Sequence, residues 1–320
     1  MLIAFLFFGS VPFWIRSVGL YEYIGVEILI WCIYALGYNL ALGYTGLPSF
    51  GHGAFLGTGA YAMALYQLRL DGENLWLGLL AAVAAGAVAS AVVGIFISHR
   101  RGIYFALLTI AFGQLFWFVS IKWHSVTGGE DGLQNLKRLP CELGFASFTI
   151  QENVNLYWFT FILFMLTVVG LWTVIHSPFG RVIQAVKQNE MRCKFIGYDV
   201  RIYKWMSFTI SGAIAGLAGG LFSLAQQSAY PDVMSLHQSG IVVMMTVIGG
   251  GFVCYWGPVY GTIFYFCARD VLGARTETWL LWYGLLFMLI VMFKPEGLAG
   301  IRWRDLRGWI SRLVMKGKHV

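Results

Sequence analysis

The polar side chains best suited to handle a solute lie in residues 37–55, GYNLALGYTGLPSFGHGAF, within an otherwise apolar stretch. A continuous helix facing lipid would not contain this run of glycines and Pro48, because the backbone groups that they free need hydrogen-bond partners. The run therefore predicts a broken or re-entrant helix that lines a cavity. Inside a membrane, the N-terminus of a half-helix attracts a carboxylate, and unwound carbonyls accept hydrogens from an ammonium or amide group. The predicted pathway residues here are Asn39, Tyr44, Thr45, Gly46, Ser49, Gly51 and His52.

A second glycine cluster, IGGGF at residues 248–252, is followed closely by the sequence WGP. Glycines and a proline at this spacing again interrupt a predicted helix. We therefore add Gly249 and Gly250 to the predicted pathway.

Ionisable residues within the apolar stretches are few. They are Glu27 and the pair of neighbouring residues Arg269 and Asp270, whereas a proton- or sodium-coupled transporter normally contains more such residues. His52 has two interpretations: a proton relay, or hydrogen-bonded packing, which is the commoner role of a lone histidine flanked by glycines. A secondary transporter that couples through Glu27 and His52 is thus a less favoured alternative, and a purely structural membrane subunit is another.

Motifs for nucleotide hydrolysis and for proteolysis are missing from the sequence. There is no GxxxxGK[ST] phosphate loop, no HExxH motif and no CxxC pair among the five cysteines. We predict a non-enzymatic chain without a metal site or a cofactor of its own. If such a chain moves a solute, another subunit must supply the energy.

Composition decides which elements position these residues. The chain has 320 residues, of which 58% are hydrophobic and 12% charged, whereas soluble domains carry about 25% charged residues. One transmembrane helix needs about 20 apolar residues. The sequence thus predicts an all-α polytopic membrane protein of about ten spans with broken or re-entrant helices. The predicted spans are 2–15, 24–42, 46–66, 75–98, 103–121, 156–175, 205–225, 239–255, 257–272 and 279–293.

The net charge of +7 is a topology signal rather than a nucleic-acid signal. With alternating spans, the loops that contain Arg100 and Arg101, residues 177–204 and the tail from Lys294 lie on one side, with 15 Lys and Arg against four acids. The other side has seven Lys and Arg against eleven acids. The positive-inside rule makes the first side cytoplasmic.

The inner loop predicts an amphipathic helix, here called the amphipathic segment (residues 177–200). Ser177 can cap its N-terminus, Pro178 suits the first helical position, and Gly197 can end it. Such a helix either lies among lipid headgroups or binds a cytoplasmic partner. Elsewhere, GxxxG spacing at Gly212, Gly216 and Gly220 predicts close helix packing.

Six blocks in fixed order resemble one known family. They are residues 36–65, 100–114 (RRGIYFALLTIAFGQ), 127–133 (TGGEDGL), 177–221, 246–261 and 294–300 (KPEGLAG). The chain resembles the permease subunits of ABC importers for branched-chain amino acids, specifically the Liv-type M subunit. GIYFALLT and TGGEDGL distinguish it from the H-type partner.

The resemblance implies a multi-pass protein of the bacterial inner membrane. Residues 1–300 would form the permease domain, with a periplasmic loop at 122–155, and residues 301–320 a basic cytoplasmic tail. The expected partners are an H-type permease subunit in a heterodimer, two cytoplasmic ATPase subunits that bind ATP and Mg²⁺, a periplasmic binding protein facing residues 127–142, and membrane lipid, but no nucleic acid.

In this family the amphipathic segment corresponds to the coupling helix that docks into the ATPase. The coupling residues implied are Arg181, Gln184, Lys187, Gln188, Asn189 and Glu190. Valine at Gly46 or Gly51 is predicted to abolish uptake without loss of assembly.

The implied solute is a branched-chain or other hydrophobic amino acid, and urea, short amides or aromatic acids are the alternatives. The sequence departs from the common pattern in its many large aromatics, such as Phe116, Trp117 and Phe118. These indicate either lipid-interface belts or a cavity adapted to a different solute.

Overall fold

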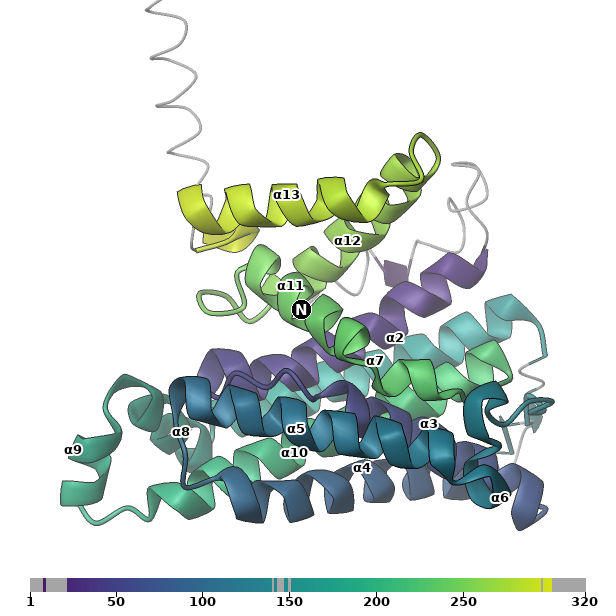
Figure 1. Ribbon diagram of the computed structural model, residues 1–320, viewed down its shortest axis with the longest axis horizontal. Helices are drawn as coiled ribbons and strands as arrows, with labels where there is room; N and C mark the ends of the chain where they lie inside the picture. The colour runs from purple at the N-terminus through teal and green to yellow at the C-terminus, as the bar shows by residue number, and fades with distance from the viewer. Residues whose placement is uncertain are drawn as a thin grey trace, which may run out of the picture. The chain divides into compact units, whose positions relative to one another are not determined.

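A computed structural model describes residues 8–9, 22–139, 141–142, 147–148, 151–294 and 296–300 (Figure 1). The chain divides into two compact units, residues 1–243 and 244–320. The predicted tail (301–320), and all of the predicted first span (2–15) except Phe8 and Gly9, lie outside the described residues.

The first unit is built from long helices joined by short ones. In chain order its elements are α2 (Glu22–Asn39), the π-helix η1 (Leu40–Tyr44), α3 (Gly53–Arg69), α4 (Leu75–Ile97), α5 (Gly102–Lys122), α6 (His124–Thr127), η2 (Gly129–Asp131), β1 (Cys141–Glu142), β2 (Ser147–Phe148), α7 (Asn153–His176), α8 (Pro178–Gln188), α9 (Glu190–Phe195), α10 (Val200–Gln226) and η3 (Pro231–Met234). Helix α11 (Leu236–Gly249) begins in this unit and ends in the second. The second unit continues with α12 (Gly257–Gly273), α13 (Trp279–Phe293) and η4 (Leu298–Gly300).

The polytopic helical architecture is confirmed, but ten spans are not. Within the described residues, six helical segments are long and apolar enough to cross a membrane. They are Tyr23–Tyr44, Leu75–Ile97, Gly102–Lys122, Asn153–His176, Val200–Gln226 and Trp279–Gly300. Two predicted spans are shortened by glycines and prolines: α3 begins only at Gly53, and α11 ends at Gly249. α12 has 17 residues, slightly fewer than the usual span of about 20.

The loop at residues 122–155 contains a short strand pair in an otherwise helical chain. Within the described residues of the loop, β1 and β2 pair antiparallel, with Cys141 opposite Phe148 and Glu142 opposite Ser147. The helices α6 and η2 come before this pair. The loop is therefore partly structured, as the sequence predicts.

Glycines bring α10 close to α4, which confirms the packing prediction from the GxxxG spacing. A Cβ added at Gly216 would overlap the carbonyl oxygen of Ala82 and lie 3.0 Å from the Cα atom of Gly86. One added at Gly220 would lie 2.7 Å from the Cβ of Ala82. On another face of α10, Gly219 lies against Leu56 of α3. Because only glycine leaves room for such backbone approach, α10 packs tightly between α3 and α4.

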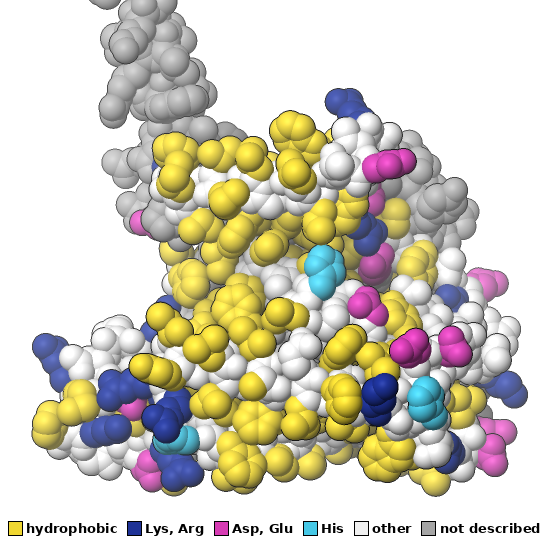
Figure 2. Space-filling view, in the orientation of Figure 1, with side chains coloured by type: hydrophobic (Ala, Val, Ile, Leu, Met, Phe, Trp, Pro, Cys, Tyr) yellow, Lys and Arg dark blue, Asp and Glu magenta, His cyan; other side chains and the backbone are white. Residues whose placement is uncertain are grey.

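The opposite faces of the long helices remain apolar and exposed. Leu80, Val88 and Phe96 of α4 are exposed, as are Ile103 and Leu107 of α5. Figure 2 shows hydrophobic side chains spread over these helices. Such surfaces are favourable against lipid or a partner membrane subunit and unfavourable in water.

The connecting loops of the first unit gather at two ends, as alternating spans require. At the α8–α9 end, the Lys204 ammonium donates to the Arg100 carbonyl oxygen at 2.8 Å. At the α6 end, the Lys137 amide donates to the Gln67 side-chain oxygen at 3.0 Å. Figure 2 shows a concentration of Lys and Arg side chains at the α8–α9 end. This is the end for which the charge pattern of the sequence predicts a cytoplasmic position.

A matched pair of substitutions tests the glycine contact. Gly216→Ala should lower the free energy of unfolding by about 1–3 kcal/mol, because the new methyl group forces α4 and α10 apart. Gly170→Ala in α7 is the control, since nothing lies within 4 Å of its Cβ position and alanine favours a helix by up to about 1 kcal/mol. Thermal unfolding in detergent measures both, and equal melting temperatures for the two variants would contradict the contact.

Candidate functional site

The predicted interruption after α2 is confirmed, and it is here called the helix break (residues 40–52). Helix α2 widens into the π-helix η1, and the chain then runs without regular structure until α3 begins at Gly53. The Thr45 hydroxyl donates to the Leu40 carbonyl at 2.9 Å and lies 2.5 Å from the Ser207 hydroxyl of α10. Gly46 has a φ of +77°, which turns the chain back. π-Helical turns inside helices occur frequently at functional sites.

Neighbouring helices hold the returning part of the helix break through its backbone amides. The Phe50 amide donates to the Thr109 hydroxyl of α5 at 3.1 Å, and the Gly53 amide donates to the Ser239 hydroxyl of α11 at 2.9 Å. Gly51 is so close to α5 that a Cβ there would overlap the Thr109 carbonyl. Gly51 therefore serves the close packing of the break against α5, while its place in the solute pathway stays a prediction.

His52 is enclosed by aromatic rings, which fits the packing interpretation. Its ring centroid lies 5.9 Å from that of Tyr34 and 5.2 Å from that of Tyr38. Its Nε2 atom lies 3.0 Å from the Ser211 hydroxyl. Among the described residues, no hydrogen bond or ion pair joins His52 to a carboxylate, so the geometry offers no second group for a relay.

Several buried polar atoms around the helix break lack a hydrogen-bond partner among the described residues. They are the Tyr34 hydroxyl, both amide atoms of the Asn39 side chain, the Ser49 hydroxyl and the Nδ1 atom of His52. Asn39 is 1% exposed, and Ser49 and His52 are 0% exposed. A buried polar atom without a partner costs about 1–3 kcal/mol, and such atoms in a native protein require an explanation.

The amphipathic segment forms two helices rather than the single one predicted. The Ser177 hydroxyl accepts from the Gly180 amide at 3.2 Å, as the predicted cap should. Helix α8 then ends because Asn189 is extended, with φ −156° and ψ 98°. The Asn189 side chain accepts from the Arg192 amide at 3.0 Å and thereby starts α9. Asn189 is thus a capping residue, a role that its predicted place in the coupling set did not include.

The other predicted coupling residues differ in what they contact. Arg181 and Gln188 are exposed. The Gln184 side-chain amide donates to the Ile175 carbonyl at 3.3 Å, which ties α8 to the end of α7. These contacts leave Arg181 and Gln188 available to a partner.

Lys187 turns toward the helix break. Its Nζ atom lies 2.5 Å from the Gly43 carbonyl oxygen, to which it donates. A Cβ at Gly46 would lie 3.1 Å from the Lys187 Cγ atom, so the side-chain stem also touches the break. Partial burial lowers the pKa of Lys187, because desolvation penalises the charged amine. Sequence reasoning missed this contact, since no pattern relates residues 144 positions apart.

Glu190 is the centre of an ion cluster that the sequence did not reveal, here called the Glu190 cluster (Arg101, Glu190, Lys194 and Lys204). Its carboxylate lies 3.1 Å from Arg101, 3.3 Å from Lys194 and 3.4 Å from Lys204. Lys204 is 2% exposed. The sequence signal for this cluster is the position of Glu190, an acid in a segment that is rich in Lys and Arg. Glu190 therefore anchors α9 to the N-terminal ends of α5 and α10.

A cavity of about 370 Å³ lies between the helix break and the amphipathic segment. Its lining includes Thr45, Gly46 and Leu47 from the break and residues 186–190 from the segment. Arg101 and Lys204 complete it. The structure thus brings two predicted sets of residues, far apart in the sequence, to one place.

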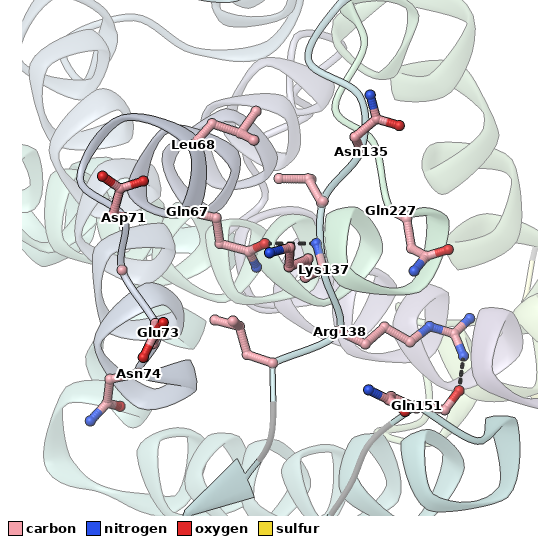
Figure 3. Close-up of a pocket in the computed structure, with 13 residues that line it drawn as sticks. Gln67, Leu68, Asp71, Glu73, Asn74, Asn135, Lys137, Arg138, Gln151 and Gln227 are labelled. Carbon is pink, nitrogen blue, oxygen red and sulfur yellow. Dashed lines mark hydrogen bonds between the residues drawn. The ribbon is translucent and has the colours of Figure 1, made fainter.

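At the other end of the first unit lies a polar pocket of about 980 Å³, lined in part by Asp71, Glu73, Lys137 and Arg138 (Figure 3). The two acids come from the loop between α3 and α4, and the two cations come from the segment after η2. The Arg138 guanidinium donates to the Gln151 carbonyl at 2.8 Å and to the Asn153 side-chain oxygen at 2.9 Å. Acidic and basic groups thus occupy different walls of one pocket.

Backbone strain is concentrated around the same polar pocket. Asp71, Asn135 and Gln227, with φ of 46°, 64° and 55°, are the non-glycine residues of positive φ in the described part of the chain. All three line the pocket. Strained backbone of this kind clusters at ligand clamps and switch regions.

Gly249 and Gly250 lie in the second unit, at the predicted second interruption. Helix α11 ends at Gly249, Gly250 has a φ of +81°, and α12 begins at Gly257. A Cβ at Gly249 would overlap the Gly257 carbonyl. Both glycines are therefore required by a tight turn. In the same unit, Arg269 pairs with Asp270 at 3.3 Å.

The predicted aromatic belt is divided. Phe116 and Trp117 pack against a buried cluster that includes Tyr61 and Met234, whereas Phe118 is 56% exposed. The aromatic residues therefore serve both the core and the exposed surface.

Within the described residues no group of three or more metal-ligating side chains occurs.

Comparisons with known proteins agree on one family. The family model for the permease component of the branched-chain amino acid transport system matches residues 20–293. LivM, a high-affinity branched-chain amino acid transport system permease protein of Escherichia coli K12, is 27% identical over 84% of this chain and 68% of its own length. BraD, a high-affinity branched-chain amino acid transport system permease protein of Pseudomonas aeruginosa, is 24% identical over 84% of this chain and 91% of its own length.

A probable LivH permease protein of Methanocaldococcus jannaschii is 26% identical over 87% of this chain and 90% of its own length. No solved structure matches the chain.

The two glycines of the helix break should respond differently to alanine. Gly51→Ala should destabilise the fold by about 1–3 kcal/mol, because its methyl group would overlap α5. Gly46→Ala strains a positive φ and should cost about 1 kcal/mol, with assembly retained. Size-exclusion chromatography after heating measures both; a Gly51→Ala protein as heat-resistant as the unmodified chain would contradict the contact.

Proposed function

Because the chain belongs to the family of branched-chain amino acid transport system permease components, we propose that it carries branched-chain or other hydrophobic amino acids inward as one membrane subunit of an ABC importer. It is a transport component rather than an enzyme. ATP and Mg²⁺ would bind to separate ATPase subunits. The membrane would be the bacterial inner membrane.

The observation that carries this proposal is the set of unpartnered polar atoms at the helix break. The side-chain polar atoms of Asn39 and Ser49 are buried without hydrogen-bond partners among the described residues, at a cost to stability that packing alone does not explain. A passing amino acid would supply the missing partners. Its carboxylate accepts from an amide or hydroxyl, and its ammonium donates to an amide oxygen or a free carbonyl.

The exposed part of the amphipathic segment fits a docking surface for an ATPase. Besides Arg181 and Gln188, the end of α9 presents Phe195 and Ile196, which are 83% and 76% exposed. Exposed apolar side chains beside cations are typical of a contact with another protein. We therefore place the ATPase contact on α8 and α9. Closure of two ATPases would then rock the attached spans.

The polar pocket at the opposite end fits the side that receives the solute. Its separate acidic and basic walls, formed by Asp71 and Glu73 and by Lys137 and Arg138, complement a partner with charges of both signs. We propose that a periplasmic binding protein delivers the solute there. The exposed apolar faces of α4 and α5 are available to an H-type permease subunit and to lipid.

Urea, short amides and aromatic acids remain the alternative solutes, because Asn39 and Ser49 would also hydrogen-bond an amide. Uptake of radiolabelled leucine, urea and benzoate by the reconstituted complex, with and without ATP, separates them. We expect ATP-dependent uptake of leucine. Uptake driven by a pH gradient without ATP would overturn the importer assignment.

Asn39→Leu tests whether the unpartnered side-chain atoms of Asn39 serve the passage of the solute. Leucine has a similar size and removes two unpartnered polar atoms, so the melting temperature should stay equal or rise, while uptake should fall at least about tenfold. Thr45→Val is the control, because its hydroxyl is bonded to Leu40 and Ser207 and its loss should lower stability. Unchanged uptake by Asn39→Leu would contradict a pathway role.

The docking surface is tested by Arg181→Glu combined with Gln188→Glu. The charge reversal should reduce co-purification of the ATPase, because both side chains are exposed on α8. Lys122→Glu, at the exposed opposite end of the unit, is the matched control and should not change it. Equal amounts of ATPase with all three proteins would refute docking on α8.

A further inference from the structure

We propose that Lys187 is a positioning residue that links α8 mechanically to the helix break, so that movement of α8 changes the conformation of the break. This inference rests on the proposed ATPase contact at α8 and α9. It gives Lys187 a role inside the membrane subunit, in place of the predicted contact with the ATPase.

The Gly43 carbonyl lacks its usual helical partners, and the sequence explains why. In a continuing α-helix it would accept from the amide of Leu47, but that amide donates instead to Ala41 at 2.8 Å. The Gly46 amide donates to Leu42 at 3.2 Å. Pro48, the next residue, has no N–H to offer. The break therefore leaves Gly43 with a carbonyl that a side chain must satisfy.

Lys187 supplies that hydrogen bond, at 2.5 Å from Nζ to the Gly43 oxygen. Carbonyls at the C-terminus of a helix carry a partial negative charge, so an ammonium group is the favourable partner. The contact has a second part, since Gly46 faces the Lys187 stem so closely that a Cβ added there would lie 3.1 Å from Cγ. Head and stem of the side chain thus both hold the turn of the break.

The base of Lys187 is held as firmly as its end. Ile183 and Val186 of α8 are buried at 0% and 5% exposure. Three residues after Lys187, Glu190 binds Arg101 and Lys204 of the Glu190 cluster. Because Lys187 projects from an element that is fixed on both sides, a displacement of α8 must either move Gly43 or break the bond.

Breaking the bond has a cost that couples the two regions. Without Lys187, the Gly43 carbonyl is buried without a partner, at about 1–3 kcal/mol, until the break rearranges. Recovering the Leu47 amide as a partner would require the chain after Tyr44 to continue the helix. That change would move Asn39 and Ser49, which flank the turn. The π-helix η1 is therefore the element with two possible arrangements.

Lys187→Met tests the link, because methionine preserves most of the stem and removes the donor. In the reconstituted complex with its ATPases and binding protein, leucine uptake and ATP hydrolysis are measured together. We expect ATP hydrolysis and ATPase co-purification to persist, while the amount of leucine taken up per ATP falls about tenfold. Lys187→Arg, which retains charge and donors, should restore most of it.

Lys194→Met is the matched control, because Lys194 binds Glu190 and does not line the cavity between the helix break and the amphipathic segment. Its uptake per ATP should stay within about twofold of the unmodified complex. If the Lys187→Met chain itself does not fold, Lys187→Gln, which retains an uncharged donor, replaces it. The leucine uptake per ATP of Lys187→Gln should lie between those of Lys187→Met and the unmodified complex.

Amide hydrogen exchange of residues 42–47 provides a readout that a merely structural role would not move. Trapping the ATPases with ADP and vanadate should change exchange there in the unmodified complex and not in Lys187→Met. Unchanged uptake per ATP in Lys187→Met, or loss of the ATPase from the complex, would overturn the link. Failure of the proposed function is distinct, since the unmodified complex would then show no ATP-dependent uptake.

Discussion

Every backbone amide and carbonyl buried in an apolar surrounding needs a hydrogen-bond partner, and the architecture around the helix break depends on this constraint. Residues 40–52 give up regular helical pairing, so side chains from elsewhere replace it. The Thr109 hydroxyl of α5 accepts a hydrogen bond from one backbone amide, and the Ser239 hydroxyl of α11 accepts from another. Lys187 of α8 donates to the Gly43 carbonyl. An interrupted helix here is thus a joint product of three other elements, which explains why these elements converge on it.

The same constraint separates two kinds of buried polar group. Several backbone groups at the break have hydrogen-bond partners, whereas Asn39 and Ser49 keep side-chain atoms without partners among the described residues. A protein that is optimised for stability alone would replace both by apolar residues of similar size. Buried polar atoms of this kind support the proposal that a polar solute passes the break transiently and supplies the missing partners.

Some features were predictable from single residues and their spacing. Glycines and Pro48 located the interruption, Gly216 and its neighbours located the close contact of α10, and Ser177 marked the start of α8. Each of these depends on local chemistry: a missing side chain, a missing N–H or a capping hydroxyl. One expectation was wrong because it extended a local pattern too far. The amphipathic segment reads as one helix, but Asn189 divides it into α8 and α9.

The sequence by itself determined that this chain is a multi-pass helical membrane protein with a basic side and an interrupted helix, because composition, charge asymmetry and helix-breaking residues act locally or additively. Only the tertiary structure decided that Lys187 meets Gly43, that Glu190 binds Arg101 and Lys204, and that the strained residues Asp71, Asn135 and Gln227 surround one pocket. These contacts join segments distant in the chain. Their geometry depends on how α5, α8 and α10 pack, which no residue pattern within one helix encodes.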